Sequence, residues 1–269
     1  MLTFTLNNGL EIPAIGSGTN TFGKENRDYM GTINNDTSEI DIAIKLGYRH
    51  FDTAISYRNE AVVALGIKNS GVERSEFYIT SKIPGTPEFT KNEDAVEAGI
   101  SSSLKALDTD YIDLYLIHHP WDNLDEILKV WNVLEKYVYN GSLMSIGVSN
   151  FNEKQLGFLL EHASVKPVVN QIESHPGKWN DTIVEYSLSH NVIPVAWGPL
   201  SRVSDEAKAA LTKIGQRTGK SWAQVALRYQ LDRGVIIIPK SHNYERQKAN
   251  IELEDFSLTN EEKSIISKL

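Results

Sequence analysis

Residues 111–120 of the chain are YIDLYLIHHP, an apolar run that stops at two adjacent histidines. Leu114, Leu116 and Ile117 predict a buried strand, and Pro120 ends it because proline has no backbone N–H to donate to a neighbouring strand. His118 and His119 are therefore expected at the carboxyl end of a core strand. Histidines in such a place can be metal ligands, a catalytic acid or base, or polar residues that simply end a strand.

Similar runs recur along the whole chain. Eight of them predict strands: AIGSGT (14–19), YRHFDTA (48–54), FYITSKI (77–83), YIDLYLIH (111–118), SLMSIGVS (142–149), PVVNQIES (167–174), VIPVAW (192–197) and VIIIP (235–239). Helical patterns lie between them, at 36–47, 59–69, 90–107, 125–139, 153–163, 180–190, 205–232, 244–251 and from 259 onward. Asp36 and Thr90 are expected to cap two of these helices, because each has a glutamate three residues later. Strands that alternate with helices predict parallel pairing through right-handed crossovers.

Eight such units without a linker favour a closed (β/α)8 barrel that forms one domain over residues 1–269. An amino-terminal hairpin is expected before it, turning at Asn7-Asn8-Gly9. The alternative is an open doubly wound sheet, for which GSGTNTFG (16–23) would have to be the dinucleotide fingerprint. Thr21 occupies the sixth position, where that fingerprint has glycine, so the closed barrel is favoured.

Composition excludes several classes of function. The chain has no cysteine, which rules out disulfides and thiolate zinc sites, and its net charge of -8 argues against a nucleic-acid surface. No apolar run is long enough to span a membrane, and the amino terminus lacks the pattern of a secretory signal. We expect a cytoplasmic monomer. The last three residues, Ser267-Lys268-Leu269, match a peroxisomal signal, so a peroxisomal location is the alternative.

Polar residues at the carboxyl ends of barrel strands are candidates for catalysis, because these ends meet at one mouth. Four such residues are Asp52, Tyr57, Lys82 and His118. Each has a structural alternative when taken alone: a capping aspartate, a core aromatic, or a lysine that merely ends its strand. Together they fit better, because a buried lysine needs an anion, which Asp52 supplies. A cation beside Tyr57 is expected to lower the pKa of its hydroxyl from about 10 towards neutral pH.

The motifs around these residues resemble the aldo-keto reductase family, in particular shorter microbial members such as diketo-gluconate reductases. The similar segments are GYRHFDTAISYRNE (47–60), ITSKI (79–83), DYIDLYLIHHP (110–120), IGVSNF (146–151), VVNQIESHP (168–176), VAWGPLS (195–201) and IPKSHNYERQKAN (238–250). The resemblance implies NADPH-dependent reduction of small aldehydes or ketones, with ordered use of the cofactor. It also implies a catalytic tetrad of Asp52, Tyr57, Lys82 and His118, in which Tyr57 donates the proton and His118 orients the carbonyl.

The same resemblance implies a set of NADP(H) contacts. Ser149, Asn150 and Gln171 match the residues that bind the carboxamide, and Trp197 stands where relatives usually stack a tyrosine on the nicotinamide. The pyrophosphate would meet Leu200 and Ser201, the 2′-phosphate would meet Lys240, Ser241 and Arg246, and Asn250 matches an adenine contact. Ala249 departs from the family, where many members have glutamate. KSHNYER (240–246) could also be a solvated basic turn without a ligand. The apolar VIIIP before it predicts instead that this segment lies at the barrel mouth.

The implied substrate pocket contains Asn20, Phe22, His119 and Trp121, and the segment 20–37 is longer than the loop often found there. His119 occupies a position where relatives often carry an aromatic side chain. We expect no metal at the histidine pair, because adjacent residues of a strand point to opposite faces.

Two other classes of function remain open on the residues alone. Lys82 at a strand end could form a Schiff base in an aldolase or isomerase. The chain could also be a sensor that binds a nucleotide without catalysis.

Overall fold

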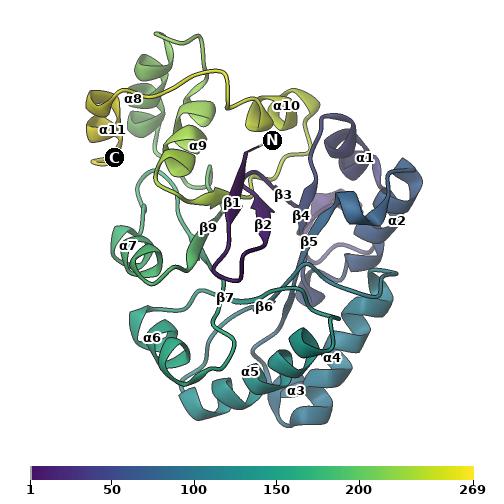
Figure 1. Ribbon diagram of the computed structural model, residues 1–269. Coiled ribbons are helices and arrows are strands. Elements are labelled where there is room, and N and C mark those ends of the chain that lie inside the picture. Colours follow the sequence, from purple (N-terminus) through teal and green to yellow (C-terminus); the bar gives the residue numbers. More distant parts are fainter. Residues whose placement is uncertain (1) are drawn as a thin grey trace.

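Eight parallel strands form the centre of the computed structural model, which describes residues 2–269, and helices surround them (Figure 1). The strands are β3 (Ser17–Gly18), β4 (His50–Asp52), β5 (Tyr78–Ile83), β6 (Leu114–Ile117), β7 (Ile146–Ser149), β8 (Val169–Glu173), β9 (Ile193–Trp197) and β10 (Ile236–Ile237). Each strand pairs with its neighbour in chain order, from β3 to β10. Ile15 bridges Ile237 in parallel, and Gly16 N donates to Ile237 O at 2.8 Å, so the sheet closes on itself. The predicted barrel is confirmed.

The hairpin covers the amino-terminal end of the barrel. Its strands β1 (Thr3–Thr5) and β2 (Glu11–Pro13) pair antiparallel across a turn in which Gly9 has φ 84°, a conformation that favours glycine. The Asn7 amide donates to Pro167 O and Asn191 O, which precede two barrel strands. The hairpin's apolar side chains therefore pack against the inside of the barrel. These side chains and their partners include Leu6, Ile12, Tyr78, Leu114, Leu116, Val169, Val195 and Ile236.

The helices that follow the strands pack around the barrel. They are α1 (Ser38–Lys45), α2 (Glu60–Ser70), α3 (Pro87–Thr90), α4 (Glu93–Ala106), α5 (Leu124–Tyr139), α6 (Glu153–His162), α7 (Asp181–Ser189), α8 (Asp205–Gly215), α9 (Trp222–Asp232), α10 (Tyr244–Ile251) and α11 (Asn260–Ile266), with short 3-10 turns η1 (Glu25–Arg27), η2 (Ile55–Tyr57) and η3 (Arg74–Glu76). The predicted cap at Thr90 is wrong, because the Asn92 side chain caps α4. At α1 the N-cap position is Thr37, one residue later than expected, but Thr37 makes no side-chain capping hydrogen bond and the Asp36 side chain accepts from Ser38 N at 2.9 Å. Thr90 belongs to the separate short helix α3.

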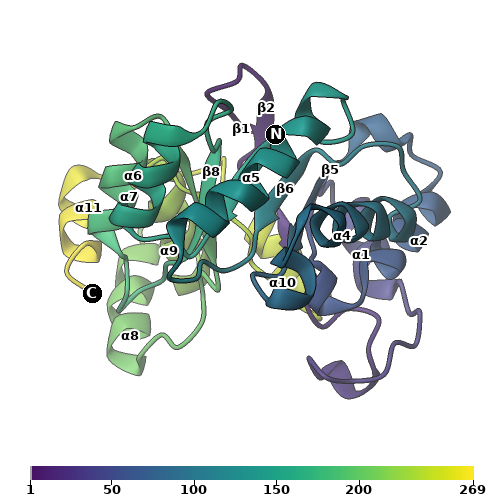
Figure 2. The same cartoon turned by 90° about the horizontal axis from the view of Figure 1, so that it is seen from below.

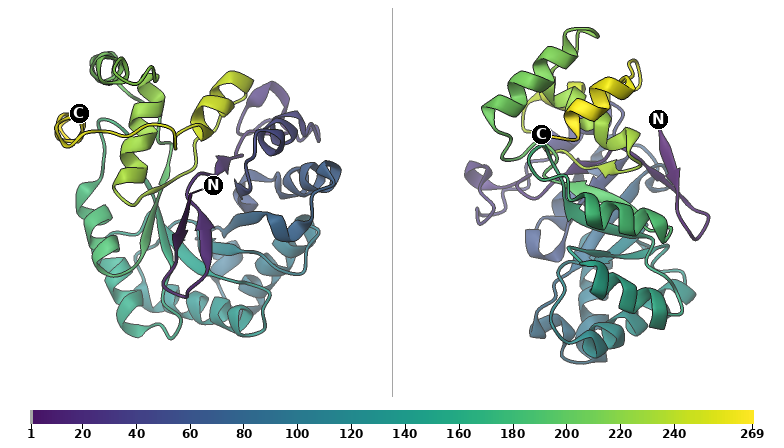
Figure 3. Two further views of the ribbon diagram at one scale, coloured as in Figure 1. Left: turned by 45° about the horizontal axis from the view of Figure 1, so that its top comes forward. Right: turned by 90° about the vertical axis from the view of Figure 1, so that its left-hand side faces the viewer.

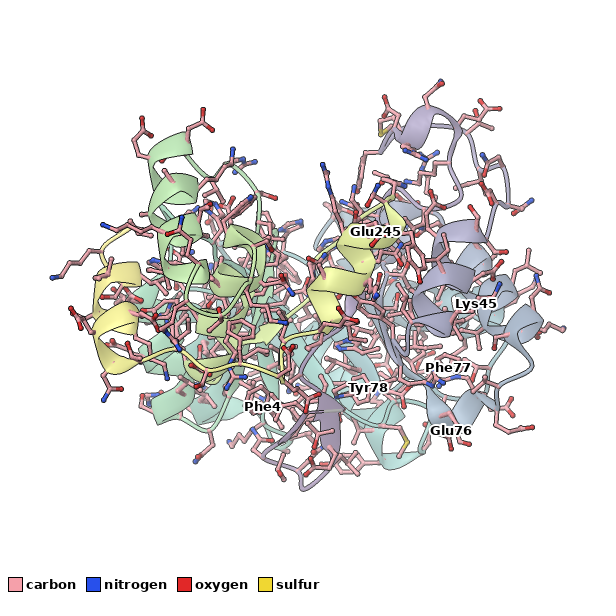
Figure 4. The ribbon with its side chains drawn as sticks, turned by 90° about the horizontal axis from the view of Figure 1, so that it is seen from above. Phe4, Lys45, Glu76, Phe77, Tyr78 and Glu245 are labelled. Carbon is pink, nitrogen blue, oxygen red and sulfur yellow. The ribbon has the colours of Figure 1, made fainter. Side chains whose placement is uncertain are left out.

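The carboxyl ends of the strands face away from the hairpin. The purple segment around η1 and the helix α8 project on the side opposite β1 and β2 (Figures 2 and 3). Figure 4 shows Phe4 of the hairpin and Tyr78, at the start of β5, towards one end, while Glu245 on α10 lies nearer to the other end. No helix within residues 2–269 is long and apolar enough to cross a membrane.

Candidate active site

A cavity of about 430 Å³ opens at the carboxyl ends of the strands. It is lined by Gly18, Thr19, Asn20, Asp52, Tyr57, His118, His119, Ser149, Asn150, Gln171, Trp197, Gly198, Pro199, Leu200, Ser201, Ile238, Pro239 and Lys240. Parallel strands bring these residues together although they are far apart in the sequence. Most of the residues that the sequence predicts for catalysis and cofactor binding therefore share one site.

A buried ion pair lies at the floor of this cavity. Lys82, fully buried on β5, donates from Nζ to Asp52 Oδ1 at 2.6 Å, to Thr53 O at 2.8 Å and to Tyr57 Oη at 3.4 Å. The second oxygen of Asp52 accepts from Gln171 Nε2 at 2.7 Å. The three contacts supply one acceptor for each N–H group of a charged Lys82. This arrangement fits an ammonium ion, which has no lone pair.

The expected decrease in the pKa of Tyr57 is wrong. Burial raises the pKa of its hydroxyl well above the ordinary value, and the carboxylate of Asp52 raises it further. The nearby Lys82 does not reverse this, because burial and Asp52 together outweigh a cation that is already paired with Asp52 at 2.6 Å. Tyr57 is therefore a neutral hydroxyl at neutral pH, and it can donate a proton when negative charge develops on a nearby oxygen.

His118 lies beside Tyr57 just past the end of β6. The two rings meet edge to face with centroids 5.5 Å apart. Burial, with Lys82 nearby, lowers the pKa of His118 to about 2, so the ring is neutral. Its buried Nδ1 has no hydrogen-bond partner among residues 2–269. A neutral imidazole can hydrogen-bond a carbonyl oxygen without adding a charge to the site.

The two adjacent histidines do not point to opposite faces. The rings of His118 and His119 stack with centroids 4.5 Å apart and 10° between their planes. The expectation from strand alternation is wrong because β6 ends at Ile117, so neither residue belongs to the strand. Within residues 2–269, no group of three or more metal-ligating side chains is arranged around an ion site.

Asn150 connects several residues of the cavity wall. It follows β7 with φ 63°, a left-handed conformation that asparagine tolerates better than most residues. Its Oδ1 accepts from Trp197 Nε1 at 2.9 Å. Its Nδ2 lies 3.2 Å from His118 O, 3.1 Å from His119 Nδ1 and 3.0 Å from Ser149 Oγ.

A tight turn after β9 borders the other side of the cavity. Gly198 has φ 59°, and a Cβ there would lie 3.1 Å from Ser201 Oγ. This turn carries Leu200 and Ser201 to the cavity wall. Lys240, which follows the neighbouring strand β10 and also lines the cavity, donates from Nζ to Thr21 Oγ1 at 2.8 Å. The cavity wall therefore includes both a cation and a close-packed turn.

The remaining predicted cofactor residues lie on α10 or just before it. The N-cap residue Asn243 accepts from Arg246 N at 3.0 Å, and Ser241 Oγ accepts from Asn243 N at 3.1 Å. Asn250 is buried near the end of the helix. Arg246 is exposed and forms no ion pair with any residue from 2 to 269, so its guanidinium is free for a ligand.

Two of the four predicted pocket residues do not line this cavity. Phe22 is fully buried, with its ring edge-on to His242 at 5.3 Å between centroids, because the chain turns inward there. Trp121 packs against Gly85 and lines a separate groove beside α3 and α5. Asn20 and His119 do line the cavity.

The sequence alone did not reveal the role of the segment 20–37. Tyr29 packs edge-on against Tyr57, with ring centroids 6.0 Å apart, and its hydroxyl donates to Ser56 O at 3.3 Å. Lys24 and Arg58 both donate to the carbonyl oxygen of Tyr29, at 2.7 and 3.0 Å. The length of the segment was the only available signal.

His242 makes two side-chain contacts with other segments near the barrel mouth. Its Nε2 lies 2.8 Å from Thr21 Oγ1, and its Nδ1 lies 2.7 Å from Glu39 Oε1. Because Thr21 also bonds Lys240, these contacts tie the turn after β10 to the segment after β3 and to α1.

Comparisons with known proteins agree with this geometry. The model of the aldo/keto reductase family matches residues 14–269. The chain is 40% identical to glyoxal reductase of Bacillus subtilis (strain 168) over 271 residues, which cover 99% of this chain and 92% of that protein.

Two solved structures are similar along almost their whole length. A Brucella melitensis aldo/keto reductase superposes with a TM-score of 0.90 and 34% identity, covering 99% of this chain and 98% of that one. A Bombyx mori aldo-keto reductase in complex with NADP superposes with a TM-score of 0.88 and 35% identity, covering 99% and 92%. The chain therefore belongs to the aldo/keto reductase family.

Proposed function

We propose that the chain reduces small aldehydes and ketones to alcohols with NADPH, and that Tyr57 donates the proton. The observation that carries the proposal is the Asp52–Lys82–Tyr57 cluster beside neutral His118 at the floor of the cavity. Family membership and the NADP complex of the Bombyx mori relative support NADP(H) as the cofactor.

The residues divide the chemistry between them. Bound NADPH supplies a hydride to the carbonyl carbon. Tyr57 gives its proton to the carbonyl oxygen as negative charge develops there, which completes the alcohol. His118 orients that oxygen through a neutral hydrogen bond. Lys82, held by Asp52, stabilises the phenolate that Tyr57 becomes, because its ammonium then faces an anion 3.4 Å away.

The groups that line the cavity support NADP(H) as the cofactor. Ser149, Asn150 and Gln171 bring hydrogen-bonding groups to the cavity wall, which also includes the flat indole of Trp197. The close-packed turn at Gly198 brings Leu200 and Ser201 near a phosphate-bearing chain, and Lys240 provides a cation. We propose that Ser241, Arg246 and Asn250 extend this site to the adenine end.

Neither alternative is supported. A Schiff base needs a lysine with a free lone pair, whereas Lys82 Nζ is surrounded by three acceptors. A sensor without catalysis would not need a buried ion pair beside a tyrosine and a neutral histidine. Trapping with borohydride and substrate, followed by mass measurement, should leave Lys82 unmodified.

We also propose that the chain works as a cytoplasmic monomer with one barrel domain over residues 1–269. The hairpin supports a single domain because its side chains pack inside the barrel. The terminal Leu269 packs against the core, and its carbonyl accepts from Gly177 N at 3.1 Å.

The test of the proposed function is NADPH consumption with a panel of carbonyl compounds. Glyoxal, methylglyoxal, a simple monoaldehyde, a keto acid and a sugar would be compared at fixed enzyme concentration. The Bacillus subtilis relative is a glyoxal reductase, which supports glyoxal as a first substrate to try. We expect NADPH to be consumed with at least one of the aldehydes. Consumption with none of them would contradict the proposal.

Arg246→Ala is expected to weaken NADPH binding while leaving NADH binding nearly unchanged. The arginine can form a planar pair of hydrogen bonds with the 2′-phosphate, which NADH lacks. Hydrogen bonds to a charged group contribute roughly 1.5–3 kcal/mol, so the dissociation constant for NADPH should rise about 10-fold or more. Titration of protein fluorescence with each cofactor measures both constants.

Lys248→Ala is the matched control, because this lysine lies on the same helix but faces Glu252 at 3.9 Å. It should change the NADPH-to-NADH ratio by less than about 2-fold, as expected of an exposed charge. Equal dissociation constants for NADPH and NADH in the unmodified protein would remove the role given to Arg246 and Lys240.

Asn20→Trp is expected to shift substrate preference towards aromatic aldehydes and away from polar ketones. Asn20 lines the cavity, and its buried Oδ1 has no hydrogen-bond partner among residues 2–269. An indole there would make the cavity smaller and less polar. The measurement is the ratio of kcat/KM for the two substrate classes, with Asn20→Ala as the control that adds no bulk. An unchanged ratio in Asn20→Trp would mean that Asn20 does not contact substrates.

A further inference from the structure

We propose that His119 is held in a single tautomer, with its proton on Nε2, and that this N–H binds a second oxygen of the substrate next to the reacting carbonyl. The inference rests on the proposed function and makes His119 a specificity-determining residue. It assigns the enzyme to carbonyl compounds with an oxygen on the adjacent carbon, such as 1,2-dicarbonyls.

Two neighbouring groups fix the orientation of the Asn150 amide, because one can only donate a hydrogen bond and the other can only accept one. An indole N–H can only donate, and Trp197 Nε1 lies 2.9 Å from the Asn150 oxygen. A carbonyl can only accept, and His118 O lies 3.2 Å from the Asn150 nitrogen. A flipped amide would place donor against donor at Trp197 and acceptor against acceptor at His118. The amide nitrogen therefore faces these acceptors.

This orientation decides which nitrogen of His119 carries the proton. The Asn150 amide nitrogen lies 3.1 Å from His119 Nδ1 and has no lone pair to offer, so a proton on Nδ1 would face another donor. The two N–H groups of the amide are shared among His119 Nδ1, His118 O and Ser149 Oγ, all of which can accept. The remaining proton is on Nε2. Doubly protonated His119 would put an N–H against the amide N–H, and burial together with Lys82 lowers the pKa of His119 as well. Neutral His119 with a free Nε2–H is the form that fits.

The place of His119 makes that free N–H useful to a substrate. Its ring lines the cavity and stacks on His118 at 4.5 Å with nearly parallel planes. Its Nε2 forms no hydrogen bond with any residue from 2 to 269, whereas Nδ1 is engaged. The reacting oxygen is expected at His118 and Tyr57, so a donor on the neighbouring ring is close to an oxygen on the next carbon. A substrate without that oxygen gains nothing from His119.

The first test is direct observation of the tautomer in the protein without cofactor. Correlation of ring nitrogens with ring protons by NMR, assigned with His119→Gln, identifies which nitrogen is protonated. We expect protonated Nε2 and unprotonated Nδ1 near neutral pH. In Trp197→Phe the amide loses its fixed donor, and a mixture of the two tautomers is expected. Protonated Nδ1 in the unmodified protein would overturn the inference.

The second test compares methylglyoxal with propanal, which has the same carbon chain without the second oxygen. His119→Leu should lower the ratio of kcat/KM for methylglyoxal to kcat/KM for propanal roughly 3- to 30-fold, as expected for one lost hydrogen bond. His119→Gln keeps an N–H and should restore part of the loss. If both substrates are reduced and their ratio does not move, the inference fails while the proposed function stands. If NADPH reduces neither, the proposed function fails and this inference fails with it.

Discussion

Tyr57→Phe is expected to lower kcat for carbonyl reduction by about 100- to 10,000-fold, the usual contribution of a positioned proton donor. The change removes only the hydroxyl, whose position is 3.4 Å from Lys82 Nζ. Because burial raises the pKa of this hydroxyl, the tyrosine is fully protonated at neutral pH, and no other tyrosine within residues 2–269 lines the cavity. The hydride would then have to form an alkoxide without a proton.

The measurement is single-turnover oxidation of NADPH with a saturating aldehyde, together with titration of the cofactor. Affinity for NADPH should stay within about 5-fold, since the loss of one neutral hydrogen bond typically costs about 1 kcal/mol. Tyr29→Phe is the matched control, because this tyrosine touches the ring of Tyr57 but its hydroxyl bonds only Ser56 O. It should retain most of the activity. Retention of more than about a tenth of the rate by Tyr57→Phe, with chemistry rate-limiting, would exclude Tyr57 as the donor.

Lys82→Met is expected to destabilise the protein by about 3–5 kcal/mol in addition to abolishing most activity. The lysine is completely buried, and its removal leaves the carboxylate of Asp52 without a counter-ion in the barrel interior. Gln171 still donates to Asp52, but one neutral hydrogen bond does not replace a cation. The unpaired carboxylate would also raise the pKa of Tyr57 further. Urea unfolding with linear extrapolation measures the change in the free energy of unfolding.

The double variant Lys82→Met with Asp52→Asn separates stability from catalysis. It removes both charges and should recover about half or more of the lost stability, because no buried charge remains unpaired. It should not recover activity, because nothing then stabilises the phenolate of Tyr57. A loss of less than about 1 kcal/mol in Lys82→Met alone would mean that the ion pair contributes no more than an exposed one.

The order of the strands could be read from the chain because each is a short apolar run bounded by breaks. All eight predicted runs contain an observed strand, and β6 (Leu114–Ile117) ends three residues before Pro120. Helix boundaries were less accurate. Thr90 has good capping spacing, but Asn92 caps the helix, and Asp36 accepts from Ser38 N although it lies one residue before the N-cap position of α1. Several residues near a helix start can cap it, and tertiary packing selects one of them.

The site could be anticipated to the extent that strand ends converge. Asp52, Lys82 and His118 follow from the parallel topology, since each lies at the carboxyl end of a strand or next to it. Phe22 could not be placed in the same way, because a loop residue has no periodic constraint on its direction. For the same reason the sequence did not predict the contact of Tyr29 with Tyr57, because Tyr29 lies in a segment without regular strands.

By itself, the sequence determined the barrel, the residues at its mouth and the kinds of group they bring to it. These depend on local pattern and on a topology that parallel strands impose. Only the tertiary structure decided the protonation of those groups. The pKa of Tyr57 rises where a neighbouring lysine alone would lower it, because burial and Asp52 outweigh a cation that is already paired. The proposed tautomer of His119 depends on Trp197 and Asn150, which come from other strands. The charge of a group and the direction of its hydrogen bonds depend on all the groups around it. Those groups come together only in the folded chain.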